Sequence, residues 1–276
     1  SAYLRIYFLG MIPNLFYNMG AAVLRAIGDS RRPLYFLILS CLSNIVLDLV
    51  FVVSLHMGVA GAALATILSQ AASAIMVLYV LLHTDSEVRL NPRELRMDFG
   101  WLKKMIYVGL PAGLQSTMYT ISNIIVQATV NSFGTNTIAA VTAYGKMDVL
   151  FWMVINAFGI AITTFVGQNY GAGQVKRAFQ GFRVSFALSA FATLFLSAVI
   201  WFFGMDFLHF FTKDPAVLAI CWRLIHYVVP FFITYIPIEL CSGTLRGMGN
   251  SWMPMIMTMI GVCVLRLFWI FLAVPL

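Results

Sequence analysis

Eight apolar runs follow one another along the chain, and each is long enough to cross a bilayer as a helix. They cover residues 3–24, 33–54, 58–82, 105–131, 136–166, 178–203, 216–245 and 252–275. A transmembrane helix needs about 20 predominantly apolar residues. Apolar and polar residues do not alternate with a period of two within these runs, which argues against a membrane β-barrel. The pattern predicts an all-α, polytopic transmembrane bundle of about eight helices.

The composition supports this pattern and excludes a soluble globular protein. Hydrophobic residues make up 61% of the 276 positions and charged residues only 10%, whereas soluble domains carry about 25% charged residues. The sequence contains no glycine-rich phosphate loop, nucleophile elbow or HExxH pattern. We therefore expect neither enzyme activity nor a bound metal or cofactor.

Basic residues are concentrated in every second loop between the predicted helices. The loops near residues 25–32, 83–104, 176–183 and 246 hold most of the arginines and lysines. Loops rich in these residues stay on the cytoplasmic side, so the alternation predicts a multi-pass protein of the cytoplasmic (inner) membrane. A nucleic-acid-binding surface would not alternate loop by loop, so we attribute the net charge of +7 to membrane topology and expect the lipid bilayer, not nucleic acid, as the partner.

The longest polar stretch divides the helices into two groups. Residues 83–104 contain Pro92 and five basic residues, and a structureless loop of this length is unusual inside a compact unit. We predict a partial N-terminal lobe with three transmembrane helices at 1–82, a cytoplasmic linker at 83–104, and a partial C-terminal lobe with five helices at 105–276.

A ten-residue motif occurs once in each predicted lobe. Residues 24–33 read LRAIGDSRRP and residues 245–254 read LRGMGNSWMP, with five identical positions. In both copies glycine can end one helix, Asp or Asn with Ser can cap the next, and proline fits its first turn. The two copies share one orientation, as in transporters built from parallel repeats. A six-helix repeat would give about twelve helices in all, of which this chain would hold the fourth to the eleventh.

These motifs and several shorter ones resemble the multidrug and toxic compound extrusion (MATE) family of transporters, most closely its prokaryotic branch. The matching segments are Tyr3–Ile6, Leu24–Ser30 with Pro33, Asn44, Leu47–Asp48, Gly58–Thr66, Gly109–Pro111, Ala143–Gly145, Gln168–Gly173 and the second copy of the motif. The resemblance implies two pseudo-symmetric lobes that face each other across a central cavity. It also implies secondary active efflux of organic cations in exchange for H+ or Na+. The family's coupling acid on its first helix would lie outside this chain.

Charged groups inside apolar helices are costly and therefore mark candidate functional sites. The strongest candidate is Glu239 in the run 216–245, with Tyr235 one helical turn earlier on the same face. The resemblance implies that this pair matches a tyrosine and an acid of Na+-coupled members, whereas a second acid of those members is replaced here by Tyr119. Alternatively, Glu239 is a structural carboxyl that holds two helices together.

Two further acids lie well inside apolar runs. Asp148 shares a helical face with Tyr144, and Asp48 shares a face with Asn44. Each pair is either part of a cation or substrate site, or a structural link: a salt bridge to another helix for Asp148, and a polar clamp for Asn44 and Asp48. The arginine at the middle of the last run, Arg266, needs a partner that the sequence does not identify.

Polar residues recur every four positions along the run 105–131. They are Gln115, Tyr119, Asn123 and Gln127. This spacing places them on one slowly winding stripe of a helix. Because amides are costly against lipid, the stripe faces protein or water. It either lines the substrate cavity or forms hydrogen bonds to neighbouring helices.

We therefore predict a monomeric efflux transporter in which Glu239 and Asp148 exchange between H+ or Na+ and a small cationic substrate. A flippase for lipid-linked oligosaccharides or related lipids, built on a similar two-lobe scaffold, is the alternative. A cavity for polyanionic head groups should be lined by several arginines or lysines. Basic residues in the middle of the membrane are few here, chiefly Lys146 and Arg266, which favours the cation exporter.

Overall fold

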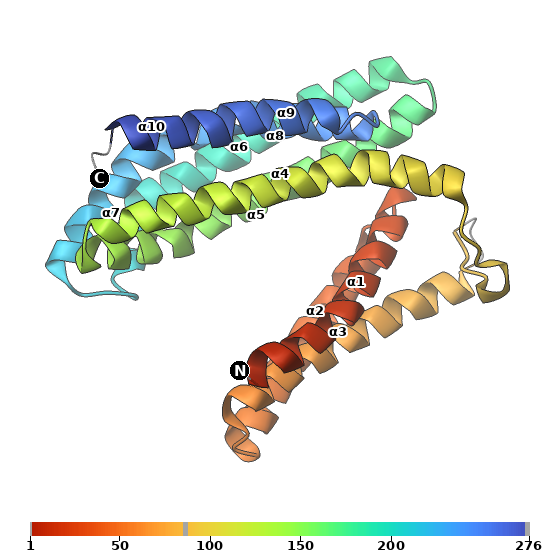
Figure 1. The fold of residues 1–276 in the computed structure, drawn as a ribbon, viewed down its shortest axis with the longest axis horizontal. Helices are drawn as coiled ribbons and strands as arrows, with labels where there is room; N and C mark the ends of the chain where they lie inside the picture. Colours follow the sequence, from red (N-terminus) through yellow and green to blue (C-terminus); the bar gives the residue numbers. More distant parts are fainter. Residues whose placement is uncertain (1, 85–87, 274–276) are drawn as a thin grey trace. The chain divides into compact units, whose positions relative to one another are not determined.

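The computed structural model describes residues 2–84 and 88–273. The side chains of residues 2–7, 9 and 273 lie outside this description, and with them those of the Tyr3–Ile6 segment. The regular structure of the described residues is entirely helical (Figure 1). The chain divides into two compact units, Ser1–Met97 and Asp98–Leu276, with the boundary inside the polar stretch 83–104.

The first unit consists of three long helical segments. They are α1 (Ala2–Ala26), α2 (Arg31–Asp48), which the π-helical η1 (Leu49–Ser54) continues, and α3 (Gly58–His83). The helix α3 packs against both α1 and α2. Small side chains allow this close packing: Ser40 of α2 donates a hydrogen bond to the carbonyl oxygen of Ser69 on α3, at 2.7 Å. The three apolar runs predicted in this part of the chain are therefore confirmed as helices.

The second unit holds the other five predicted segments, two of them interrupted. Its elements are α4 (Phe99–Ser132), α5 (Thr135–Gly171), α6 (Val175–Leu208), α7 (Pro215–Val228), η3 (Val229–Phe231), α8 (Phe232–Gly247), α9 (Trp252–Thr258), η4 (Met259–Val264) and α10 (Leu265–Ala273). The run 216–245 becomes α7–η3–α8, because Pro230 cannot donate the hydrogen bond that a continuous helix needs. The last run becomes α9–η4–α10 through a π-helical segment.

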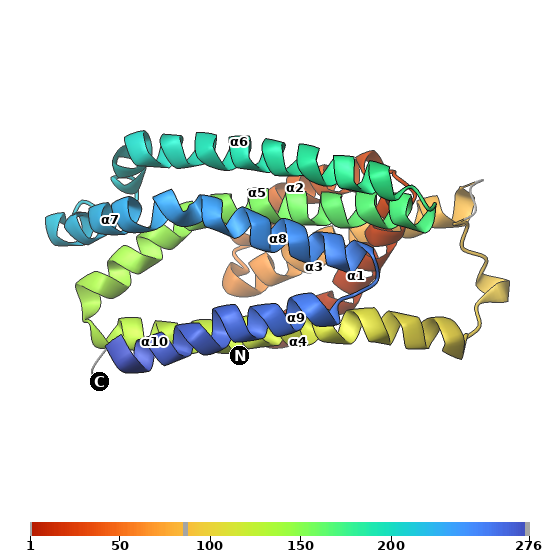
Figure 2. The ribbon, with the colours of Figure 1, turned by 90° about the horizontal axis from the view of Figure 1, so that it is seen from above.

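Within the second unit, α5 is the central helix. It packs against α6, α7 and α8, and the side chains buried among them form the main core. By contrast, α4 lies mainly against α9, η4 and α10. Figure 2 shows the two layers: α4 runs beside α9 and α10, apart from the layer of α5, α6 and α8. Polar contacts between these two layers therefore help to hold the second unit together.

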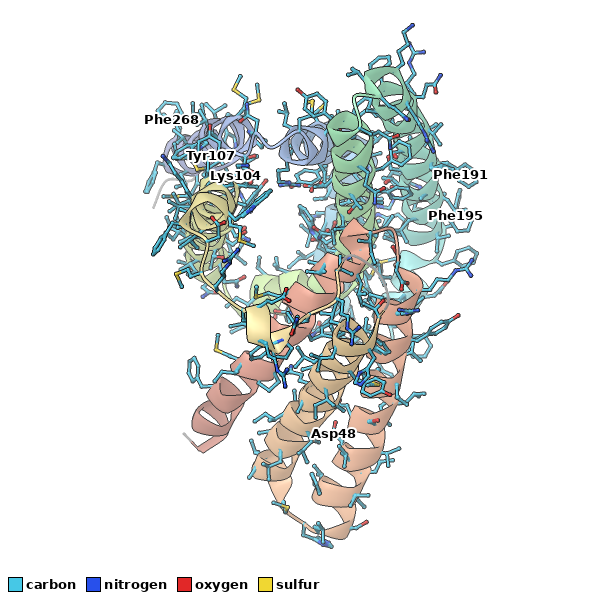
Figure 3. All side chains as sticks on the ribbon, turned by 90° about the vertical axis from the view of Figure 1, so that its right-hand side faces the viewer. Asp48, Lys104, Tyr107, Phe191, Phe195 and Phe268 are labelled. Carbon is cyan, nitrogen blue, oxygen red and sulfur yellow. The ribbon has the colours of Figure 1, made fainter. Side chains whose placement is uncertain are left out.

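Six of the described helices are long and apolar enough to cross a membrane. They span Arg31–Ser54, Gly58–His83, Thr135–Gly171, Val175–Leu208, Pro215–Gly247 and Trp252–Leu272. Large apolar side chains are exposed on the second unit. Examples are Phe191 and Phe195 on α6, which are 71% and 65% exposed (Figure 3). Exposure on this scale is what lipid contact permits and water does not. The all-α polytopic bundle predicted from the sequence is confirmed.

The repeated motif forms the same turn in both units. Gly28 and Gly249 have φ angles of 88° and 84°, and each donates a hydrogen bond to the carbonyl oxygen three residues earlier, at 2.9 and 3.0 Å. The side chains of Asp29 and Asn250 cap the next helix by accepting from the amide three residues later, at 3.1 and 3.2 Å. The serine that follows each of them makes no capping hydrogen bond. The predicted glycine ends and Asp/Asn caps are thus confirmed, and only the serine contribution is wrong.

A capping aspartate sets the start of α4. The Asp98 carboxylate accepts hydrogen bonds from the amides of Gly100 and Trp101, at 2.8 and 3.2 Å. Such a cap satisfies amides that a helix start leaves unpaired. The helix therefore begins at Phe99, inside the stretch 83–104 that the sequence pattern assigned to the linker.

Candidate functional site

Glu239 lies in a seam of small residues where α8 packs against α5. The small residues are Gly159, Thr163 and Gly167 on α5, and Gly243 and Gly247 on α8. A Cβ atom on Gly247 would lie 2.6 Å from the carbonyl oxygen of Thr163, and the Thr163 hydroxyl donates to the carbonyl oxygen of Gly243 at 3.0 Å. Small residues at four-residue spacing allow two helix backbones to approach this closely.

The Glu239 carboxylate sits directly over Gly159 in this seam. A Cβ atom on Gly159 would lie 2.6 Å from Oε1 of Glu239, so a larger residue there would force the carboxylate to shift. The same oxygen accepts a hydrogen bond from Nη2 of Arg246, at 2.7 Å. The two side chains are 16% and 23% exposed. A charge-assisted bond at this distance is among the stronger polar contacts in a protein.

Aromatic residues from three helices meet around Tyr235, which precedes Glu239 by one turn of α8. The hydroxyl oxygens of Tyr235 on α8 and Tyr119 on α4 are 3.1 Å apart and share a hydrogen bond. The ring of Trp152 on α5 meets the Tyr235 ring edge to face, with centroids 4.8 Å apart. The structure thus brings together Glu239, Tyr235 and Tyr119. The resemblance to the MATE family had related the first two to a cation site and Tyr119 to the position of a second acid.

Asp148 lies on α5, one turn before Trp152. Its Oδ2 atom accepts a hydrogen bond from the indole nitrogen of Trp152, at 2.7 Å, and no ion pair to another helix involves it among the described residues. The hydroxyl of Tyr144, one turn earlier, is buried without a partner within the same part of the chain. Asp148 precedes Gly159 by eleven residues, or about 16 Å along the helix axis. Trp152 connects the two levels, because its indole nitrogen bonds to Asp148 and its ring packs against Tyr235.

Most of the polar stripe on α4 bonds to other helices. Gln115 donates to the hydroxyl of Thr258 at 2.9 Å, and Asn123 accepts from Nη1 of Arg266 at 2.9 Å. Gln127 instead donates to Asn131 on its own helix, at 3.0 Å. With the contact between Tyr119 and α8, the stripe holds α4 against its neighbours. Asn123 and Gln127 are nevertheless exposed, so cavity lining stays a prediction for them.

The first unit holds the pair Asn44 and Asp48 on one face of α2. The amide nitrogen of Asn44 and Oδ1 of Asp48 are both buried, and neither has a hydrogen-bond partner among the described residues. Asp48 is the last residue of α2, where the π-helical segment begins (Figure 3). Buried polar groups are nearly always paired, and exceptions often mark functional positions. This pair therefore stays a candidate site.

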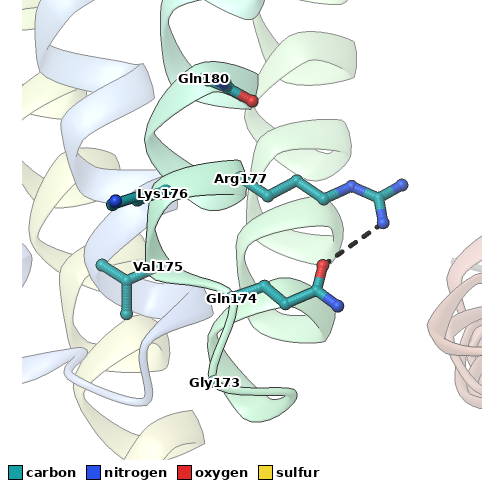
Figure 4. A pocket seen from close by; sticks show the side chains of 6 residues that line it. All are labelled: Gly173, Gln174, Val175, Lys176, Arg177 and Gln180. Atoms are coloured by element: carbon teal, nitrogen blue, oxygen red, sulfur yellow. Dashed lines mark hydrogen bonds between the residues drawn. The ribbon is translucent and has the colours of Figure 1, made fainter.

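The described residues offer no metal centre at the predicted positions, and a shallow pocket that they line lies elsewhere. No group of three or more His, Cys, Asp or Glu side chains is placed to hold a metal ion in the part of the chain that the structure describes. A shallow, open pocket lies at the turn between α5 and α6, lined by Gly173–Arg177 and Gln180 (Figure 4). The side chain of Arg177 bonds there to Gln174, at 3.4 Å.

Two residues of the Glu239 site, Arg246 and Gly159, were missed by the sequence analysis. Arg246 follows Glu239 by seven residues, about two turns of the same helix, and it belongs to the repeated motif. That spacing was a usable signal for an ion pair. Gly159 gave no comparable signal, because its role depends on which helix packs against α5.

Comparison with known proteins identifies the family. Residues 1–50 and 111–272 match the family model MatE. The chain belongs to the MatE family. It is 30% identical to the probable multidrug resistance protein YpnP of Bacillus subtilis, over 96% of the chain and 59% of that protein. It is 27% identical to the probable multidrug resistance protein NorM of Thermotoga maritima, over 96% of the chain and 58% of that protein.

The fold is also that of MATE transporters. A solved multidrug resistance MATE family transporter in an outward-facing conformation matches with a TM-score of 0.87 and 25% identity, over 93% of this chain and 58% of that one. Membership in this family of transporters confirms the predicted resemblance, and with it the prediction that the chain is not an enzyme. The MatE chain described here spans less than two thirds of these relatives.

Proposed function

We propose that the chain works in a secondary transporter that expels organic cations in exchange for H+ or Na+, by alternating access of two lobes. The observation that carries the proposal is the Glu239 carboxylate, which lies in a helix seam of the second unit beside the phenols of Tyr235 and Tyr119. An ionisable group inside a membrane helix is costly, and its presence there indicates a functional site. The names of YpnP and NorM agree with drug efflux.

The chemistry of this site suits exchange between cations. A carboxylate can hold a proton, a sodium ion or an organic cation, but only one of them at a time. Phenol oxygens add neutral ligands of the kind that hard cations accept, and aromatic faces attract organic cations. Competition for one carboxylate couples the two flows, because the coupling ion must leave before the substrate enters.

Asp148 has a different part in this proposal. It lies about 16 Å from the level of Glu239 along α5 and beside the indole of Trp152. The bond to the indole N–H fixes the edge of the Trp152 ring beside the carboxylate, and a carboxylate with an aromatic residue close by suits the charged end of an organic cation. We therefore propose that Glu239 exchanges the coupling ion for the cationic substrate, and that Asp148 makes a second contact with the same substrate.

The basic loops support a cytoplasmic position for the linker in this proposal. Arg89, Arg93, Arg96, Lys103 and Lys104 belong to the stretch 83–104, and loops of this composition stay on the cytoplasmic side of the inner membrane. The working unit that we propose is a monomer.

Transport by the intact protein in proteoliposomes tests the function. We expect ethidium to move against its gradient when either a proton gradient or a sodium gradient is imposed, and the effective gradient identifies the coupling ion. Glu239→Gln should abolish this transport, whereas Asp206→Asn, which changes an exposed acid of α6, should not. Unchanged transport by Glu239→Gln would remove Glu239 from the mechanism. Movement of a lipid-linked oligosaccharide without ethidium transport would favour the flippase.

A further inference from the structure

We propose that the Arg246 guanidinium is a resident counter-ion of Glu239, which an incoming cation has to displace. The proposal rests on the function proposed above, because it concerns how the same carboxylate selects its cation. It makes Arg246 a positioning residue that lowers the affinity of the site, in contrast to a residue that binds substrate.

The surroundings of Oε1 of Glu239 favour this exchange. Oε1 of Glu239 lies close to Gly159, where an added Cβ atom would come within 2.6 Å of it, and it also accepts from Nη2 of Arg246 at 2.7 Å. A cation that binds this oxygen closely competes with the guanidinium for the same position. Both side chains are mostly buried, at 16% and 23% exposure, so water screens the competition only weakly.

The first copy of the motif shows that the turn does not require this ion pair. Arg25 occupies the position of Arg246 in an equivalent turn, and Asn18 occupies the position of Glu239. Asn18 bonds within its own helix, donating to the carbonyl oxygen of Asn14 at 2.9 Å and also to the Asn14 side chain. The arginine is therefore placed by the motif, and its pairing with an acid is a property of the second unit.

Displacement of the guanidinium needs no change in the backbone. The carbonyl oxygen of Arg246 accepts a hydrogen bond from the amide of Gly249 at 3.0 Å, which fixes the end of α8. In the proposed exchange the side chain turns towards the helix end, where a cation is favoured by the helix dipole. The Glu239 carboxylate is then paired with a positive charge both before and after the exchange, first with Arg246 and then with the incoming cation. This avoids leaving the carboxylate as an unpaired charge inside the membrane.

Equilibrium binding of tetraphenylphosphonium to the purified intact protein tests the proposal. Arg246→Gln should tighten binding by about tenfold, the factor that corresponds to one hydrogen bond between charged groups. Arg246→Lys keeps the charge but loses the planar fork, so a smaller tightening is expected. Arg25→Gln is the matched control in the first copy of the motif, and it should leave the affinity unchanged.

The double variant Glu239→Gln with Arg246→Gln separates displacement from general repulsion. If the arginine acts through Glu239, the double variant should bind no more tightly than Glu239→Gln alone. Equal tightening in both backgrounds would mean that Arg246 repels cations at a distance, and it would overturn the proposal. If Arg246→Gln does not fold, Arg246→Lys decides, and an unchanged affinity in that variant overturns the proposal.

The same measurements distinguish this proposal from the proposed function. Glu239→Gln that binds tetraphenylphosphonium as well as the unmodified protein would exclude Glu239 as an exchange site, and both proposals would fail. Weaker binding by Glu239→Gln with no tightening by Arg246→Gln would refute only the role of Arg246.

Discussion

Arg266 on α10 donates a hydrogen bond from Nη1 to the side-chain oxygen of Asn123 on α4, at 2.9 Å. The contact answers a question that the sequence left open, namely which group accompanies an arginine in the middle of an apolar run. The partner is a neutral amide from a helix far away in the chain. The hydrogen bond joins α10 to α4. In the membrane, a contact of this kind gives a charged side chain a polar partner in place of water.

This contact predicts a measurable loss of stability. Asn123→Leu removes the acceptor and leaves the guanidinium without it, so we expect a loss of about 1–3 kcal/mol in the free energy of unfolding. Gln127→Leu is the matched control, because Gln127 bonds only within α4 according to the described contacts. Unfolding of the purified protein in detergent, followed by circular dichroism, measures both. Equal effects of the two variants would contradict a stabilising role for the Asn123–Arg266 pair.

A single methyl group on Gly159 should disable the Glu239 site. In Gly159→Ala the new Cβ atom would lie 2.6 Å from Oε1 of Glu239, so the carboxylate has to move. We expect efflux to fall by about tenfold or more while the protein still folds, since alanine favours the helix. Gly145→Ala, on the same helix with open space around the new atom, serves as the control. Efflux at the normal rate in Gly159→Ala would show that the position of the carboxylate does not matter.

The hydrogen bond between Tyr119 and Tyr235 should appear as an interaction energy in a double-mutant cycle. Tyr119→Phe and Tyr235→Phe each remove one hydroxyl of a pair that is 3.1 Å apart. We expect a coupling energy of about 0.6 kcal/mol in the free energy of unfolding, the average for side-chain hydrogen bonds between membrane helices. Strictly additive effects would mean that the two hydroxyls do not depend on each other.

The acid of the first unit should be dispensable for folding. Oδ1 of Asp48 is buried without a partner among the described residues, so Asp48→Asn removes a charge that the described contacts do not compensate. We expect the melting temperature to stay the same or rise, because an unpaired buried charge is destabilising. We also expect efflux to decrease, as for a functional acid. A lower melting temperature in Asp48→Asn would instead identify Asp48 as a structural acceptor.

The helices of this protein could be predicted almost completely from the sequence, whereas two of their interruptions could not. The apolar runs located all eight helical segments, and six of the described helices are long and apolar enough to cross a bilayer. The π-helical segments Leu49–Ser54 and Met259–Val264 left no such signal. Asp98 could have been recognised as an N-terminal cap of α4. It was overlooked because it lies in the charged stretch that we assigned to the linker.

The candidate site was predicted only as a set of residues. Glu239 and Tyr235 stand out in the sequence because polar groups are rare in apolar runs, and their shared face follows from a spacing of four. The separation of Asp148 from Glu239 also follows from helix geometry, once the structure shows that Gly159 is the residue beneath Glu239. Without that contact, the levels of two acids on different helices cannot be compared.

The sequence by itself determined the membrane class, the helix count, the repeated turn and the short list of buried acids, because each depends on composition or on spacing within one helix. Spacing along one helix already permitted Arg246 for Glu239 and Trp152 for Asp148, whereas only the tertiary structure decided Gly159 for Glu239 and Asn123 for Arg266. Two of these contacts join different helices, α5 with α8 and α4 with α10. Their pairing is set by how side chains of different helices fit together, which no periodicity along a single chain records.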